Sequence, residues 1–206
     1  IAAAGFGGDK AIFGYGTTGN LDAFRPTAIT NKVSNSGVVA SDTNGVGTVR
    51  HGLAAAGYGG SDGITDKAIF GYGAPPNFSS MTNLVSNTGV VATDVTGVGT
   101  GRWTLAAASY GGDKAVFGYG YSNASARVSM TNKVSNSGVV ASDTSGVGTA
   151  RRELAAADYG GDKAIFGTGL NLSGGHMTNL VNNSGNVAAD VTNVGTGRHN
   201  YGGAGF

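Results

Sequence analysis

The chain has 206 residues and a formal net charge of +1 at pH 7, and only 12% of its residues are charged. This balance gives no electrostatic reason to expect binding to nucleic acid or to an anionic membrane. The absence of cysteine excludes disulfides and thiolate metal sites. No apolar run of roughly 18 residues is present to suggest a membrane span, so we expect no membrane insertion.

One stretch, Asp-Lys-Ala-Val-Phe-Gly-Tyr-Gly at residues 113–120, recurs almost unchanged at three other places in the chain. The other copies are residues 9–16, 66–73 and 162–169. A spacing of about 50 residues is typical of propellers, solenoids and repeat arrays. We therefore predict a single domain, residues 1–206, built from four repeats. Their approximate bounds are 1–49, 50–101, 102–150 and 151–197, with 198–206 as a closing or exchanged strand.

The third repeat predicts four short strands, called a to d in chain order. Strand a is the Ala-rich run 105–110, strand b is 114–120, strand c is 130–136 and strand d is 139–143. Gly-Gly-Asp between a and b, and Asn-Ser-Gly between c and d, supply tight hairpin turns. No segment of about ten residues or more has an apolar period of 3.6, so we expect almost no helix.

The Ala-rich strand a predicts where the repeats meet. Only small side chains fit where inner strands converge on an axis, while the bulkier Ile, Phe and Val side chains fill the space between neighbouring blades. One such sheet cannot bury both of its faces alone, so the repeats must stack. The predicted fold is all-β, a β-propeller of four-stranded antiparallel blades with about 50 residues per blade and four blades in this chain.

The repeat resembles a kelch repeat, in which an Arg, a small-residue strand and an apolar strand ending in Gly-Gly precede a variable loop and two outer strands. The leading arginines here are Arg50, Arg102, Arg151 and Arg198. In this chain Tyr or Thr splits the Gly pair, and Val and Asn replace the usual outer-strand Tyr and Trp. The alternative is the propeller family of the regulator of chromosome condensation. The repeats also resemble arrays in virion proteins of tailed marine phages.

Residues 201–206 align with residues 1–6, so strand a is present five times against four copies of the other strands. Three alternatives follow from this count. Four blades close into a ring with a spare inner strand, or the array belongs to a longer series, or the spare strand pairs with another protomer in a homo-oligomer.

The loops differ in how much they vary between repeats. The a–b and c–d turns are nearly constant, whereas the b–c loops share almost nothing. In an antiparallel blade the b–c loops and the d–a connections lie at one end, so the variation should gather there. Binding residues tend to lie on loops that a rigid frame positions. The alternative is that these surface loops vary without function.

We predict a ligand-binding surface at this end, made largely of aromatic, Arg and His side chains. The b–c loop candidates are Phe24, Arg25, Asn77, Phe78, Tyr121, Asn123, Arg127 and His176. The candidates nearer the axis, each directly after a leading arginine, are His51, Trp103, Arg152 and His199. Aromatic and Arg side chains are the usual anchors of protein interfaces and stacking sites.

The leading arginines are interpreted as structural groups that bond to carbonyls or Asp of the neighbouring blade and fix the blade angle. The aspartates of the a–b turns are expected to cap their own backbone, with weak calcium binding as a minor alternative. These residues are Asp9, Asp66, Asp113 and Asp162.

No nucleophile, phosphate-binding or local metal motif is present, so we expect no catalysis, cofactor or metal. The expected function is a binding module for a glycan or protein, in a virion, a tail fibre or a cell surface, with a cytoplasmic location left open. The alternative is a structural unit that assembles into fibres or shells by strand exchange between protomers.

Overall fold

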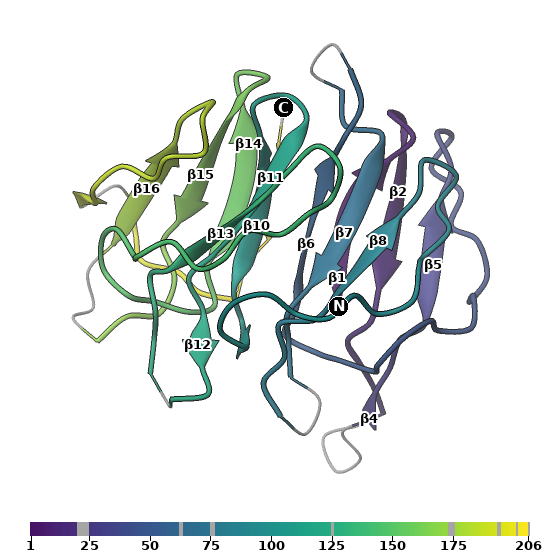
Figure 1. Cartoon of the computed structure of the whole chain (residues 1–206), viewed down its shortest axis with the longest axis horizontal. Helices are drawn as coiled ribbons and strands as arrows, with labels where there is room; N and C mark the ends of the chain where they lie inside the picture. Colours follow the sequence, from purple (N-terminus) through teal and green to yellow (C-terminus); the bar gives the residue numbers. More distant parts are fainter. Residues whose placement is uncertain are drawn as a thin grey trace.

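The structure is a computed structural model that describes residues 1–19, 25–61, 64–74, 77–124, 126–172, 176–192, 195–200 and 202–205. Over these ranges the chain forms antiparallel sheets and contains no helix (Figure 1), which confirms the all-β prediction. In the same ranges no helical segment has the length and apolar character that a membrane crossing requires.

Each repeat forms one module, in which strands a, b and c lie side by side in that order. The first module contains β1 (Ala2–Phe6), β2 (Lys10–Gly14) and β5 (Thr30–Val33). The second contains β6 (Ala54–Tyr58), β7 (Lys67–Gly71) and β8 (Thr82–Val85). The third contains β10 (Ala106–Tyr110), β11 (Lys114–Gly118) and β13 (Thr131–Val134). The fourth contains β14 (Ala155–Tyr159), β15 (Lys163–Gly167), β16 (Met177–Val181) and β17 (Val191–Thr192).

Two short strand pairs lie outside these sheets, at the end of the modules where the b–c loops run. The first module carries β3 (Thr17–Thr18) and β4 (Arg25–Pro26), and the third carries β9 (Arg102–Trp103) and β12 (Tyr121–Ser122). In Figure 1 β4 and β12 project from the lower end of the molecule.

Among the described residues, the predicted four-stranded sheet is found only in the fourth module, where β17 joins β16; the main sheets of the other three modules have three strands. In the third module the d segment meets strand c at two separate bridges, Thr131 with Thr144 and Val134 with Val140. The d segment therefore has one residue more than strand c between the same two bridges. This β-bulge interrupts the ladder and makes the outer edge irregular, which discourages edge-to-edge pairing.

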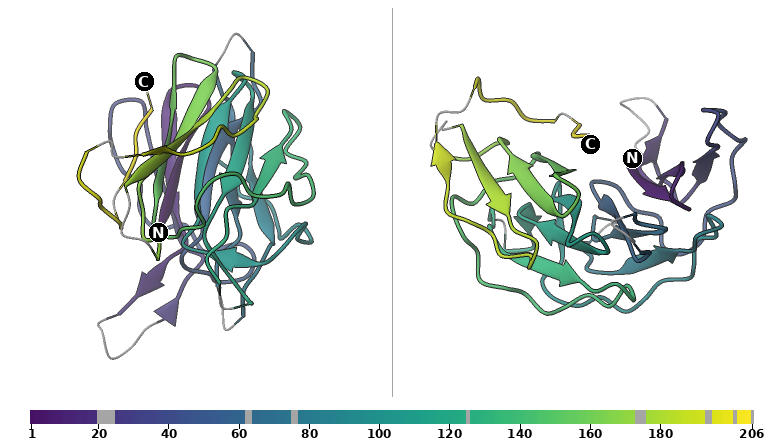
Figure 2. Two further views of the ribbon diagram at one scale, coloured as in Figure 1. Left: turned by 90° about the vertical axis from the view of Figure 1, so that its left-hand side faces the viewer. Right: turned by 90° about the horizontal axis from the view of Figure 1, so that it is seen from above.

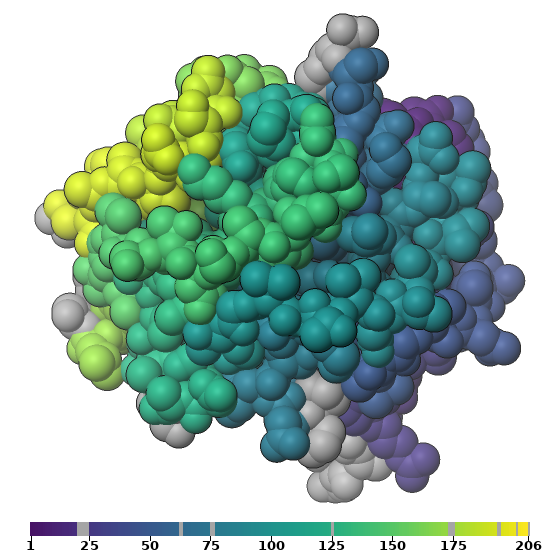
Figure 3. All heavy atoms as spheres, viewed as in Figure 1, coloured from purple at the N-terminus to yellow at the C-terminus, as the bar shows by residue number. Residues whose placement is uncertain are grey.

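Neighbouring modules pack face to face through their Ala-rich inner strands. β1 lies against β6, β6 against β10, and β10 against β14, and β1, β6 and β10 each also touch strand b of the next module. β14 does not pack against β1 in this way, and the right-hand view of Figure 2 shows an open arc with both chain ends near the gap. The described part of the chain therefore does not close as a four-module ring. On the side shown in Figure 3 the second and third modules form one continuous surface.

A phenylalanine of each later module fills the interface with the module before it. The ring of Phe70 packs against that of Tyr15, with centroids 5.2 Å apart. A Cβ on Gly14 would lie 2.8 Å from the Phe70 ring, so only glycine leaves room there. The pairs Tyr72–Phe117 and Tyr119–Phe166 repeat this contact at 5.1 Å. Burial of one such ring stabilises the fold by about 2–3 kcal/mol.

A buried arginine clamps each pair of modules. Arg50, which opens the second repeat and lies between the first two sheets, is 0% exposed, lies 4.8 Å from the centre of the Tyr15 ring of the first module, and forms an ion pair with Asp94 of the second module at 3.3 Å. Its guanidinium also donates to the side-chain oxygen of Asn83. Thr48 donates to the same Asp94 from its amide at 2.9 Å and from its hydroxyl at 2.7 Å.

The clamp recurs at the other two interfaces. Arg102 and Arg151 are also 0% exposed and lie 4.3 Å and 4.0 Å from the rings of Tyr72 and Tyr119. Thr100 and Thr149 donate to Asp143 and Asp190 as Thr48 does to Asp94. The leading arginines were interpreted as groups that bond to carbonyls or Asp of the neighbouring blade, and this is confirmed in part. Arg102 donates to the carbonyl oxygen of Thr100 in the preceding repeat at 3.2 Å. The aspartates Asp94 and Asp143 belong instead to the repeats that Arg50 and Arg102 open.

Candidate ligand-binding site

The b–c loops and the d–a connections meet at one end of the modules. Trp103, directly after a leading arginine, pairs with Tyr121 at the start of the b–c loop of the same module. The equivalent bridges in the second and fourth modules are His51 with Ala74 and Arg152 with Leu170. The prediction that these two sets of variable segments share an end is therefore confirmed.

A ladder of backbone hydrogen bonds joins the modules at this end. The amide of Thr104 donates to the carbonyl oxygen of Gly52 at 2.6 Å, that of Glu153 to Thr104 at 2.9 Å, and that of Asn200 to Glu153 at 3.0 Å. All four residues have positive φ, between 50° and 61°. For the three that are not glycine this conformation costs on the order of 1 kcal/mol each, which the ladder offsets. The ladder aligns the side chains that directly precede it.

These side chains and two from the b–c loops form a continuous row, which we call the aromatic row. The His51 and Trp103 rings meet edge to face with centroids 5.4 Å apart. Phe78 lies between Trp103 and Tyr121, with centroids 6.4 Å and 6.3 Å away. The guanidinium of Arg152 lies 5.2 Å from the centre of the Tyr121 ring. All five side chains are half-buried, so they are held in place and still reach solvent.

Glu153 extends the aromatic row and was not among the predicted site residues. Its carboxylate forms an ion pair with Arg152, with Nε 3.3 Å away, and lies 3.2 Å from His199 Nδ1. The carboxylate thus connects two predicted residues from the third and fourth connections. The signal in the sequence was that residue 153 belongs to the variable pair after a leading arginine, where the other copies have Gly52, Thr104 and Asn200.

The other predicted residues are not part of this row. Arg127 donates from Nε to the carbonyl oxygen of Leu170 at 3.2 Å, so it joins the third module to the fourth. The His176 ring lies directly on Gly197, where a Cβ would collide with it. The exposed candidates are Arg25 in β4, Asn77 and Asn123. Phe24 lies outside the described residues.

Electrostatics at this end are mild. Burial lowers the pKa of His51, and the nearby amino terminus lowers it further. The His51 ring is therefore neutral near pH 7, which suits a stacking role. The charged groups of the aromatic row are Arg152 and Glu153, which neutralise each other at 3.3 Å.

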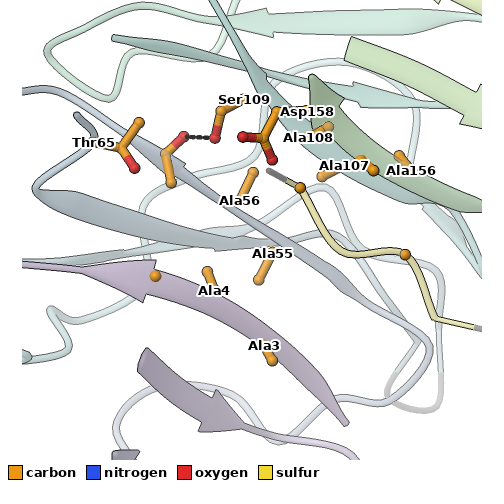
Figure 4. A pocket seen from close by; sticks show the side chains of 15 residues that line it. Ala3, Ala4, Ala55, Ala56, Thr65, Ala107, Ala108, Ser109, Ala156 and Asp158 are labelled. Atoms are coloured by element: carbon orange, nitrogen blue, oxygen red, sulfur yellow. Dashed lines mark hydrogen bonds between the residues drawn. The ribbon is translucent and has the colours of Figure 1, made fainter. Parts of the chain in front are cut away.

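A hollow lies on the axis, between the inner strands (Figure 4). Its volume is about 330 Å³, and its walls are mainly alanine methyl groups and backbone, with Thr65, Ser109 and Asp158 as the side chains that carry polar groups. The Ser109 hydroxyl donates to the carbonyl oxygen of Gly57 at 3.0 Å. This hollow offers few groups to orient a ligand, since specific sites need several convergent polar groups.

In the described ranges no three His, Asp or Glu side chains lie close enough together to hold a metal ion. The turn aspartates bond instead to the lysine that follows each of them. Asp9, for example, pairs with Lys10 at 2.5 Å and accepts from Asn35 at 3.0 Å. These two hydrogen bonds are the largest causes of the lowered pKa of Asp9.

No protein-family model matches the chain, and a search of the curated proteins gives no match. What the chain does must therefore be inferred from its residues and their geometry.

Proposed function

We propose that the chain is a non-enzymatic binding module that recognises a glycan or a protein through the loop end of a kelch-like β-propeller domain, residues 1–206. The observation that carries the proposal is the aromatic row, in which His51, Trp103, Phe78, Tyr121 and Arg152 from three successive modules touch one another. Five separate segments of the chain, three connections and two b–c loops, would converge in this way on a surface that a partner contacts.

We also infer that the stacked modules are blades of a propeller. Sheets stacked face to face around small-residue inner strands are how propeller blades bury both of their faces. The clamps of Arg50, Arg102 and Arg151 fix each sheet to the next, which supports a rigid frame under variable loops.

The chemistry of the aromatic row suits a sugar. Half-buried Trp, Phe and Tyr rings offer apolar surface for the apolar face of a sugar ring, while Arg152 can donate to hydroxyls and Glu153 can accept from them. The same residue types are the common anchors of protein interfaces, so a protein ligand is the other form of the proposal. The resemblance of the repeats to virion arrays of tailed marine phages favours a tail fibre or another virion or cell-surface component.

A second candidate function is structural assembly by strand exchange. It is favoured by residues 202–205, which lie beside β14 where a further strand a would lie: Gly203 is against Ala156 and Gly205 against Asp158. In that case the loop end would have no ligand.

The experiment is binding of the labelled chain to a broad glycan array and to intact bacterial cells. Trp103→Ala should weaken the binding at least tenfold, because Trp103 touches two neighbours in the aromatic row. The matched control is Leu172→Ala, an 86% exposed side chain of the fourth b–c loop that is outside the row. Equal loss in both variants, or no binding to any glycan or cell, would contradict the proposal.

A further inference from the structure

Each internal interface joins two different faces. The donating face consists of the glycine and Tyr of strand b of the earlier module and of the connection that leads out of it, with its threonine and the leading arginine, as in Gly14, Tyr15, Thr48 and Arg50. The later module presents a receiving face, defined by a Phe of strand b and an Asn–Asp pair. The three receiving sets are Phe70, Asn83 and Asp94; Phe117, Asn132 and Asp143; and Phe166, Asn179 and Asp190.

The first module has a complete receiving face with nothing docked on it. Phe13 is 38% exposed, whereas its three counterparts are 0% exposed. Asn31 donates from Nδ2 to Asp42 at 2.8 Å and to the carbonyl oxygen of Ala40 at 3.2 Å. Asn83 makes the same two bonds at 2.9 Å and 3.1 Å while it receives Arg50. Asn31 and Asp42 therefore already have the arrangement of an occupied receiving face, although no arginine is docked on them.

The fourth module has the matching donating face, and it is also open. Arg198 and Thr196 are exposed, whereas Arg50, Arg102 and Arg151 are 0% exposed. Gly195 has φ of 72°, close to the 80° of Gly47. A Cβ at Gly47 would collide with Asp94, whereas a Cβ at Gly195 would meet no atom within 4 Å. The turn therefore has its docked conformation without a partner.

The position beside β14, where strand a of a further module would lie, is filled by residues of this chain. Residues 202–205 lie along β14, with Gly203 against Ala156. These residues belong to the segment that repeats strand a of the first module. Figure 2 shows that this segment lies in the gap between the first and fourth modules.

We propose that both open faces of the arc dock a further module of this same repeat, one that presents a Phe and an Asn–Asp pair to Arg198 and a clamp arginine to Asp42. The charges are complementary, since a cation at one end of the arc matches a carboxylate at the other. One departure weakens the donating face: Thr168 replaces the Tyr on which the other arginines stack. The inference is independent of the proposed ligand, because it concerns stability and not binding at the loop end.

The first test lengthens the chain after Phe206 by a copy of residues 7–49, so that residues 201–206 become strand a of a fifth module. Arg198→Ala should leave the melting temperature of the original chain unchanged and lower that of the lengthened chain by about 5 °C. Arg50 already lies at an internal interface, so Arg50→Ala should lower the melting temperatures of both chains. It shows how large the effect of losing a docked arginine is.

The second test addresses the receiving face, so the proposal can be decided even where one lengthened chain fails to fold. A copy of residues 105–153 is placed before Ile1, which then follows a clamp arginine as Leu154 does. Asn31→Ala should lower the melting temperature of the original chain slightly, because it removes the bonds to Asp42 and Ala40, and should lower that of the lengthened chain by several degrees more. The proposal would be overturned if the two substitutions had no larger effect in the lengthened chains than in the original chain, if the added modules melted separately, or if both lengthened chains misfolded.

A second whole chain as the occupant would give a different result. The original chain would associate as its concentration rises, and Arg198→Ala or Asn31→Ala would each abolish the association. That outcome in analytical ultracentrifugation would overturn the proposal in favour of a homo-oligomer.

Discussion

Arg50, which stacks on Tyr15 of the first module, meets Asp94 of the second module at 3.3 Å, with the arginine side chain fully buried. Burial raises the pKa of Asp94, but the hydrogen bonds from Thr48 and Asn83 lower it more, and Arg50 adds to them, so the pKa lies below its usual value. The ionised carboxylate is therefore part of the folded interface, where it accepts hydrogen bonds from Thr48 of the first module.

Arg102→Met should destabilise the fold by about 3–5 kcal/mol, because it leaves Asp143 and Asn132 without their buried partner. Urea unfolding followed by circular dichroism measures this change. The matched variant Arg198→Met replaces the exposed arginine of the same repeat position and should change stability by less than about 0.5 kcal/mol. Similar losses in the two variants would show that the clamp is not what stabilises the interface.

Stability should fall at alkaline pH because of the tyrosines under the clamp. Burial raises the pKa of Tyr15, Tyr72 and Tyr119 to about 12, although the nearby arginines oppose the shift. In the unfolded chain a tyrosine ionises near pH 10. The unfolded state therefore loses protons first, so stability is full below pH 10 and is lost as the pH rises from 10 to 12.

Urea unfolding at pH 8, 10 and 11 checks this dependence. The triple variant Tyr15→Phe, Tyr72→Phe and Tyr119→Phe lacks the three hydroxyls and should lose less stability over the same pH range. A variant with the same alkaline slope as the parent chain would assign the loss to other groups.

Gly71→Ala should cost about 1–3 kcal/mol, since the added Cβ would lie 2.5 Å from the Phe117 ring in a filled interface. Gly202→Ala is the control, because a Cβ there meets no atom within 4 Å. Thermal melting of both variants gives the comparison. No loss in Gly71→Ala would mean that the modules are packed less closely than the structure has them.

The repeat pattern was enough to predict strands a, b and c, because Gly turns and apolar runs are local signals. The bulge between Val140 and Thr144 was not predictable, since it depends on the register between strands c and d. The sequence also could not decide between a closed ring and an open arc, because each interface between modules is the same in both. The clamp of Arg50 was predicted because arginine geometry favours such a role.

The candidate site was predicted in its location and only partly in its members. Alternation of hairpins places Trp103 and Tyr121 at one end of the modules, and this follows from topology alone. The contacts between Phe78 and those two rings depend on how the loops fold, which the repeat pattern does not specify. Glu153 was missed because its role needs the hydrogen-bond ladder that brings Arg152 and His199 to it.

Trp103 is the one tryptophan of the chain, and it lies in the middle of the aromatic row. Its fluorescence therefore reports directly on a ligand at this surface. In a titration with a glycan that the chain binds, we expect a saturable change in emission with the same dissociation constant as calorimetry gives, and Tyr121→Ala should weaken both. A ligand that binds by calorimetry and leaves the emission of Trp103 unchanged would contradict a binding surface at the loop end.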